Sequence, residues 1–183
     1  IVNVWEEDVA VQFGVSSEAS GRYAFKSLQA ATNDLKNGIV DALVTAPVNK
    51  RNIRSNDFPY NGQTEYLAAQ TNGEALMLLV NGDLRVGVVT NHLPVKDIAS
   101  LIKKDLIMKK ILMMKNSLIK DFGCNRPRIA VLGLNPHAGD SGLIGNEEIQ
   151  EIIPAINDAK SRDILCFGPY SADGFFGSGQ YPK

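Results

Sequence analysis

The sequence predicts an α/β protein whose sheet is at least partly parallel and covered by helices on both faces. Residues 39–45 and 128–134 are short runs with apolar residues at consecutive positions, which is typical of strands buried on both sides. These runs alternate with segments whose apolar residues recur at helical spacing. The length of 183 residues, 44% of them hydrophobic, is enough for the core of one domain or two small ones.

The first predicted pair of elements is a helix followed directly by a strand. Residues 21–38 carry apolar side chains at helical spacing, with Ser20 as the expected N-cap and Gly38 as the stop. The apolar run 39–45 is then predicted to be a short buried strand that ends before Pro47.

The middle of the chain predicts a helix, a hairpin and more helix. Residues 64–73 read as a helix that opens behind Gly62, and residues 75–92 as two strands that turn at Asn81-Gly82. Residues 95–123 are predicted to form one or two long helical stretches.

The last third predicts a strand, a helix and a further strand. Residues 128–134 form a continuous apolar strand, and residues 146–162 a helix with Asn146 as N-cap. Glu147 and Glu148 are expected in its first turn, where the helix dipole favours negative charge. Residues 163–170 are a candidate for the further strand.

Charge and composition exclude several classes of function. Nineteen basic and twenty acidic residues leave a formal net charge of −1, whereas nucleic-acid-binding proteins typically carry an excess of basic residues. No apolar run reaches the roughly 18 residues that span a bilayer, and no secretory signal is visible, so no membrane association and a cytoplasmic location are expected. Cys124 and Cys166 are expected to be reduced, buried thiols without a role.

Three polar segments follow predicted strands at the edge where open α/β sheets bind ligands. They are TAPVNK, TNHLP and LNPHAG, and the last two place His92 and His137 at equivalent positions. Imidazole is the commonest ligand of divalent transition metals, so these histidines are candidate co-ligands. A catalytic site generally uses three protein ligands, and the third stays unidentified. Taken singly, either histidine could instead be an ordinary surface or core residue.

A fourth segment, FPYNGQTEYL, could bind an anion. It brings Gln63 and Thr64 to a helix start, where unpaired backbone N–H groups attract phosphate. The alternative is ordinary capping, with Thr64 as N-cap and Glu65 behind it. Lys50 could add positive charge to the same cleft or could be a solvated lysine.

Familiar nucleotide-binding and hydrolase motifs are missing. Gly139, Gly142 and Gly145 are spaced by three residues, unlike the dinucleotide-binding fingerprint. No Walker A sequence and no G-x-S-x-G elbow occur, so phosphoryl transfer and serine hydrolysis lose their usual support.

Taken together, the segments TAPVNK, NGQTEYL, TNHLPV, LNPHAGDSGLIGNEEIQEIIPAI and GPYSAD resemble the 4-hydroxythreonine-4-phosphate dehydrogenase family of pyridoxal phosphate biosynthesis. They occur in order along nearly the whole chain, and the LNPHAG block is specific to that family and its close relatives. The resemblance implies an isocitrate/isopropylmalate dehydrogenase-like fold, with α/β/α layers around a mixed, largely parallel sheet. Residues 1–183 are then expected to be the central part of a two-subdomain, homodimeric enzyme, truncated at both ends, with subdomain boundaries left open.

The resemblance also implies the activity. The family oxidises 4-phosphooxy-L-threonine with NAD, and the product loses carbon dioxide. A divalent metal (zinc, magnesium or cobalt) is held by three histidines, of which His92 and His137 match the first two; the third lies in a Y-H-D-Q-G motif that this sequence does not contain. Asp173 matches an aspartate that supports the site, and Lys50 is expected near the substrate as a proton-transfer or charge-stabilising group. No residue is assigned to NAD.

One departure from the family concerns the substrate loop. The family usually reads G-H-T-E where this chain has Gly62-Gln63-Thr64-Glu65, so Thr64 carries over and Gln63 matches only by position. Glutamine cannot become a cation, which could weaken attraction for a phosphorylated substrate or change specificity. Two alternatives follow: a dehydrogenase of a related phosphorylated hydroxy acid, such as threonate or erythronate phosphate, or an inactive fragment. With two imidazoles alone, no tightly held ion is expected.

Overall fold

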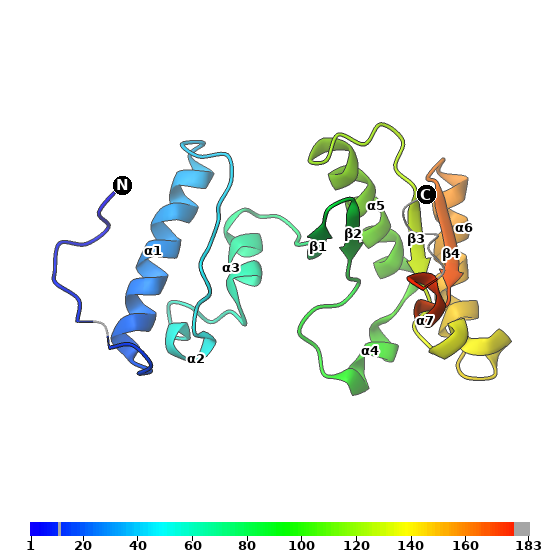
Figure 1. Ribbon diagram of the computed structural model, residues 1–183, viewed down its shortest axis with the longest axis horizontal. Helices are drawn as coiled ribbons and strands as arrows, with labels where there is room; N and C mark the ends of the chain where they lie inside the picture. The colour runs from blue at the N-terminus through cyan, green and yellow to red at the C-terminus, as the bar shows by residue number, and fades with distance from the viewer. Residues whose placement is uncertain (11, 178–183) are drawn as a thin grey trace. The chain divides into compact units, whose positions relative to one another are not determined.

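The computed structural model describes residues 1–10 and 12–177, and the chain divides into two compact units, Ile1–Ala75 and Leu76–Lys183 (Figure 1). Each unit has its own buried core. Across the described ranges, no helix is both long and apolar enough to cross a membrane.

The first unit is helical in its described residues. It contains α1 (Glu18–Lys36), α2 (Lys50–Ile53) and α3 (Gln63–Gln70). Its core is largely aromatic: Phe58 is fully buried, and its ring lies 5.4 Å from the rings of Phe25 and Tyr66. Helix α1 meets α2 at Gly21, where a Cβ atom would lie 1.8 Å from the backbone oxygen of Asn52. Only glycine permits so close a crossing.

The predicted first helix is confirmed, but its predicted cap is wrong. Helix α1 begins at Glu18, and Ser17 is its N-cap. The Ser17 hydroxyl accepts the backbone N–H of Ser20 at 3.2 Å, so Ser20 already lies in the first turn. The helix ends as predicted, with Gly38 in the left-handed region at φ 68°.

The predicted buried strand at 39–45 is wrong. The segment has no strand structure, Ile39 is 69% exposed and Val44 is fully exposed. A strand needs a neighbour for its backbone hydrogen bonds, and the described residues of the first unit contain no strand. The apolar pattern is therefore present without the sheet that would bury it.

The second unit contains both strand pairs. In chain order its elements are β1 (Leu78–Asn81), β2 (Leu84–Gly87), α4 (Val95–Leu101), α5 (Lys104–Lys120), β3 (Ile129–Leu132), η1 (Pro136–Gly142), η2 (Glu148–Ile152), α6 (Ile153–Ser161), β4 (Cys166–Tyr170) and α7 (Ala172–Phe175). Strands β1 and β2 pair antiparallel, and β3 and β4 pair parallel (Figure 1).

The hairpin and the C-terminal strands confirm the sequence predictions. Asn81 pairs with Leu84, so the two turn residues are Gly82 and Asp83, one position later than predicted. Strands β3 and β4 are joined through η2 and α6, as a parallel pair requires. The predicted helix at 146–162 forms, but Glu147 occupies its cap position in place of Asn146, and its first turn, η2, is widened.

The core of the second unit lies between its helices and the parallel pair. Helix α6 packs against β4 and against α5. The buried residues are Ile102, Ile107, Met108, Ile111, Leu118, Ile129, Ile152, Ala155, Ile156, Ala159, Ile164 and Cys166. Burial raises the pKa of the Cys166 thiol to about 11, which agrees with the expected inert, reduced thiol; Cys124 is also free but only half-buried.

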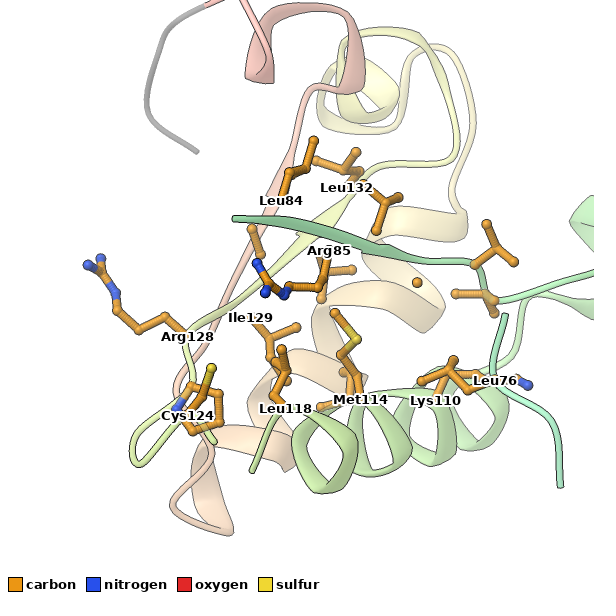
Figure 2. Close-up of a pocket in the computed structure, with 18 of the residues that line it drawn as sticks. Leu76, Leu84, Arg85, Lys110, Met114, Leu118, Cys124, Arg128, Ile129 and Leu132 are labelled. Carbon is orange, nitrogen blue, oxygen red and sulfur yellow. The ribbon is translucent and has the colours of Figure 1, made fainter. Parts of the chain in front are cut away.

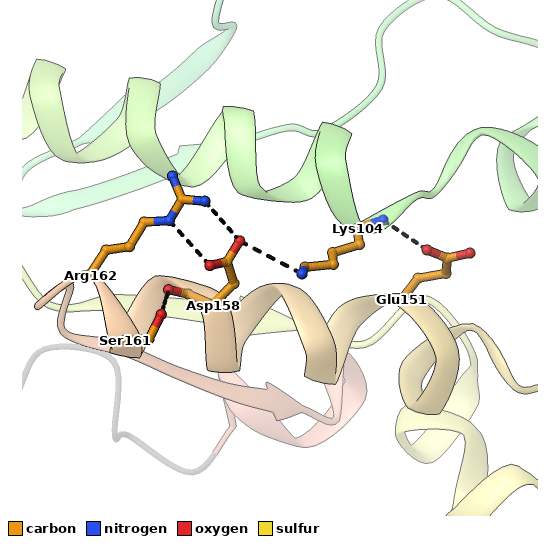
Figure 3. A network of polar contacts seen from close by, with 5 residues as sticks. All are labelled: Lys104, Glu151, Asp158, Ser161 and Arg162. Carbon is orange, nitrogen blue, oxygen red and sulfur yellow. Dashed lines mark hydrogen bonds and ion pairs between the residues drawn. The ribbon is translucent and has the colours of Figure 1, made fainter.

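Ion pairs on the surface connect α5 to the η2–α6 helix (Figure 3). The Glu151 carboxylate accepts the backbone N–H of Lys104 at 2.8 Å, at the first turn of α5. Asp158 accepts two hydrogen bonds from Arg162 at 3.1 Å and lies 3.8 Å from the Lys104 ammonium. The hydrogen bonds from Arg162 are the main reason that the pKa of Asp158 lies below its usual value.

The predicted α/β character is confirmed. In place of one continuous sheet, the described residues contain two two-stranded sheets, one antiparallel and one parallel.

Candidate functional site

The chain leaves β3 through a left-handed turn. All five residues from His137 to Ser141 have φ between 43° and 79°, and four of them are not glycine. For an L-residue this conformation costs about 1–2 kcal/mol. Such a run persists only where surrounding contacts hold it, and strained backbone of this kind is concentrated at functional sites.

The buried carboxylate of Glu148 lies beside this turn. Glu148 is 2% exposed, and its Oε1 accepts the backbone N–H groups of Leu134 and Asn135, each at 2.7 Å. Its Oε2 accepts the side-chain amide of Asn135 at 2.9 Å. Burial acts to raise the pKa of Glu148, but the hydrogen bonds from Asn135 and Leu134 outweigh it, and the pKa lies below its ordinary value.

Two glycines make room for that carboxylate. A Cβ atom on Gly139 would lie 2.7 Å from Oε2 of Glu148. A Cβ atom on Gly133 would lie 2.8 Å from the Cα of Ala138 and 3.2 Å from Oε1 of Glu148. The glycines of the LNPHAG region therefore allow strand end, turn and carboxylate to approach one another closely.

The structure brings together two of the predicted site residues, His137 and Asp173. The His137 Nδ1 atom lies 2.9 Å from Oδ2 of Asp173, in α7. Ser171 donates a hydrogen bond to the other carboxylate oxygen of Asp173. This hydrogen bond, with backbone N–H groups and the nearby His137, holds the pKa of Asp173 below its usual value.

His92 lies in the same unit, after β2, and is exposed. Its φ is 45°, so both predicted metal ligands carry the left-handed conformation that is rare for residues other than glycine. The described part of the chain contains no group of three or more His, Cys, Asp or Glu side chains arranged to hold a metal ion. The assignment of His92 and His137 as co-ligands stays a prediction.

The chemistry of His137 fits a metal ligand. Metal-binding histidines typically use one ring nitrogen for the ion and direct the other to a carboxylate. The Asp173 contact at Nδ1 supplies that second partner, and the side chain is 69% exposed. The predicted pair His92 and His137 would supply two nitrogen ligands, whereas a catalytic metal site generally uses three protein ligands.

The predicted substrate-binding residues lie in the first unit. Gly62 is the N-cap of α3, and Gln63 opens the helix and donates its side-chain amide to the backbone oxygen of Ala46 at 3.2 Å. The Lys50 ammonium lies 4.0 Å from the place where a Cβ atom on Gly62 would stand. The structure therefore places the Lys50 ammonium beside Gly62, at the start of α3.

Thr64 lies in the first turn of α3 and is half-buried. The alternative prediction, in which Thr64 caps the helix, is wrong because Gly62 holds that position without a side-chain hydrogen bond. The first N–H groups of α3 therefore have no side-chain cap.

Sequence and structure comparisons agree on the family. The model for the pyridoxal phosphate biosynthetic protein PdxA matches residues 1–183. The chain belongs to the PdxA family. A 4-hydroxythreonine-4-phosphate dehydrogenase from Bacteroides thetaiotaomicron is 45% identical over 183 residues, covering 99% of this chain and 50% of the relative. The chain spans about half the length of the curated relatives that it matches.

Solved PdxA-family structures show a similar fold. A crystal structure of 4-hydroxythreonine-4-phosphate dehydrogenase from Klebsiella pneumoniae matches with a TM-score of 0.80 at 32% identity, over 92% of this chain and 51% of the other. The enzyme of the same name from Burkholderia phymatum matches with a TM-score of 0.74 at 37% identity, over 92% and 51%.

Sequence reasoning on this PdxA-family chain missed the role of Glu148. It placed Glu148 in the first turn of a helix, which is correct, but did not foresee that its side chain bonds to the end of β3. The only signal was an acidic pair that closely follows a glycine-rich loop, and acidic residues at a helix start are common.

Sequence reasoning also missed an apolar pocket of about 640 Å³ in the second unit (Figure 2). The pocket lies between the β1–β2 hairpin, α5 and β3, and its lining includes Leu84, Met114, Leu118, Ile129 and Leu132. None of the six predicted site residues lines it. The pocket does not include His137 or Asp173, although Phe175, the last residue of the helix that carries Asp173, is part of its lining.

Proposed function

We propose that this chain is the central part of an NAD- and divalent-metal-dependent dehydrogenase of pyridoxal phosphate biosynthesis. The substrate is 4-phosphooxy-L-threonine, whose secondary alcohol is oxidised before the product loses carbon dioxide. The observation that carries the proposal is the PdxA family match along the entire chain. Relatives of that family, named for this dehydrogenase activity, are about twice as long, so the activity belongs to the whole protein.

In this proposal His92 and His137 contribute two ligands to a divalent metal, with zinc, magnesium and cobalt as candidates. A bound ion would polarise the substrate hydroxyl and stabilise the negative charge that develops on oxidation and decarboxylation. Asp173 orients His137: by accepting a hydrogen bond from Nδ1–H at 2.9 Å, it leaves Nε2 as the coordinating nitrogen.

The start of α3 would bind the phosphorylated end of the substrate. Gln63 and Thr64 lie at a helix N-terminus whose uncapped N–H groups favour an anion. Lys50 lies beside Gly62 and would add positive charge or transfer a proton there. NAD-binding residues stay unassigned.

A related substrate is the second candidate. Where the family usually has histidine, this chain has Gln63, and its amide is already directed to the backbone oxygen of Ala46. A neutral amide attracts phosphate less than an imidazolium does, which leaves threonate or erythronate phosphate as alternatives. The 183-residue chain alone is expected to be inactive.

The finer features of the fold are also part of the proposal. In the whole protein we expect α/β/α layers of the isocitrate/isopropylmalate dehydrogenase type, a homodimer and a cytoplasmic location. Two observations support further layers: the exposed apolar segment 39–45, and the apolar pocket that separates β2 from β3. Additional strands would cover the first and fill the second.

The direct test is an assay of the full-length protein. NAD reduction is measured with 4-phosphooxy-L-threonine and with threonate 4-phosphate, before and after removal of metal by a chelator. We expect metal-dependent turnover of the first substrate, and its loss in His137→Ala. Faster turnover of threonate phosphate would favour the second candidate, and full activity after chelation would contradict the metal assignment.

A further inference from the structure

We propose that Glu148 is a positioning residue that holds the His137 turn in its left-handed conformation and so fixes where the imidazole points. Its contribution to metal binding rests on the function proposed above. Its effect on the backbone does not.

The first reason is that the carboxylate bonds away from its own helix. Its side-chain oxygens accept the backbone N–H groups of Leu134 and Asn135 and the side-chain amide of Asn135, the residues that lead into the turn. A buried carboxylate is costly unless its oxygens are satisfied. Within the described residues no cation pairs with Glu148, so the cost is offset by hydrogen bonds to this one loop.

The second reason is that the carboxylate lies close to the chain on both sides of His137. On one side it accepts the N–H groups of residues 134 and 135; on the other, Oε2 fills the space beside Gly139, where a Cβ would stand 2.7 Å away. Loss of the hydrogen bonds would therefore release the backbone that leads into the turn, and a side chain at residue 139 would displace the carboxylate.

The third reason is that His137 has little other support. Its side chain is 69% exposed, and it contacts the carboxylate of Asp173, whose side chain is itself 55% exposed. Because both side chains are this exposed, packing against neighbouring residues does not fix the orientation of the His137 ring. The direction of the ring is then set by the backbone of the turn together with Asp173.

Glu147 provides a matched control. It precedes Glu148 directly and also accepts the side-chain amide of Asn135, at 2.7 Å. It is half-buried and makes no hydrogen bond to the backbone N–H groups of Leu134 or Asn135 in the described structure. Glu147→Gln thus removes the same charge beside the same asparagine but leaves the acceptor of the Leu134 and Asn135 backbone N–H groups in place.

The first measurement is amide hydrogen exchange on the 183-residue chain. In Glu148→Gln we expect the amides of Leu134 and Asn135 to exchange about 10- to 100-fold faster, because each loses a charged acceptor. Amides of β4, such as Cys166, serve as the reference for global opening. Glu147→Gln should leave all of these rates within about twofold.

The second measurement is zinc affinity of the full-length protein by calorimetry. Glu148→Gln is expected to weaken binding about 10- to 100-fold, as loss of an outer-shell partner does, while Glu147→Gln is near wild type. Wild-type protein that binds no zinc would overturn the proposed metal function but leave the exchange result standing. Unchanged exchange at Leu134 and Asn135 in Glu148→Gln would overturn the positioning role itself.

Global unfolding of Glu148→Gln would make its exchange rates uninformative, and Gly139→Ala then decides. Its added methyl group would stand 2.7 Å from Oε2 and strain a residue at φ 79°. We expect faster exchange at Leu134 and Asn135 with Cys166 still protected. Wild-type rates at both amides would contradict the proposal.

Discussion

The two units of the chain differ in how completely they bury their apolar residues. The second unit encloses twelve buried core residues between two helices and a parallel strand pair. In its described residues the first has four, of which Phe58 and Tyr66 are aromatic, and it leaves residues 39–45 exposed except for the half-buried Leu43. The comparison indicates that the second unit buries its apolar residues more completely than the first.

The largest expected loss of stability comes from a substitution in the core of the first unit. Phe58→Ala removes a fully buried ring that contacts three other aromatic rings, which should cost about 3–5 kcal/mol. Trp5, the single tryptophan, packs 4.9 Å from Tyr23 of α1 and reports on the first unit. Urea unfolding followed by its fluorescence should shift to lower urea.

Phe13→Ala is the control for that experiment, because Phe13 is 97% exposed and the chemical change is the same. Hydrogen exchange in the second unit should be unchanged in both variants. Equal destabilisation of both units by Phe58→Ala would show that they unfold together and would contradict the comparison.

The second effect is the acid sensitivity of the second unit. The folded-state pKa of Glu148 lies below the ordinary value of 4.5, so its contribution is complete above pH 4.5 and is lost as the pH falls through the lower folded value. Glu148→Gln should cost about 1–3 kcal/mol at neutral pH and progressively less in acid. Unfolding monitored by exchange at Cys166 at neutral and acidic pH measures the difference.

Ile156→Ala is the control for the pH dependence of the stability loss in Glu148→Gln. Ile156 is 1% exposed and apolar, so its loss should cost about 2–5 kcal/mol at every pH. If Glu148→Gln lowers the free energy of unfolding by the same amount at neutral and at acidic pH, the Glu148 carboxylate is not preferentially ionised in the folded state.

The third effect depends on chain length. Val44→Ser should change the stability of the 183-residue chain by less than about 0.5 kcal/mol, because Val44 is fully exposed. In the full-length protein the same change should cost about 1–3 kcal/mol if an added strand buries residues 39–45. Thermal unfolding of the two proteins side by side tests this, and equal small effects would argue against the added strand.

The smallest loss of stability is expected from the charged side chains that connect α5 and α6. Asp158→Asn removes the charge that pairs with Arg162 and Lys104 (Figure 3). The Asp158 side chain is 22% exposed, but its partners Lys104 and Arg162 are 44% and 54% exposed. Ion pairs with partners this exposed contribute little and are screened by salt, so the loss should be smaller than that of Glu148→Gln and should decrease at high salt. A loss that persists in molar salt would indicate a structural role beyond charge.

Local patterns predicted most elements of both units. The helices at 18–36, 95–101 and 104–120 and the hairpin at 78–87 follow from spacing and turn residues, which act over a few positions. The same reasoning failed at residues 39–45, because an apolar run predicts a strand only if a neighbouring strand is present. It also misplaced two helix caps, since adjacent polar residues compete for the same N–H groups.

The sequence by itself determined the family, the α/β character and the identity of the candidate site residues, because these depend on motifs and short-range periodicity. The tertiary structure decided which residues meet: His137 with Asp173, Lys50 with Gly62, and Glu148 with a loop fourteen residues away. Contacts of that kind depend on how the chain returns on itself. The position of Glu148 in the sequence places its carboxylate correctly in a helix. It does not indicate that the carboxylate will bond to the chain at the end of β3.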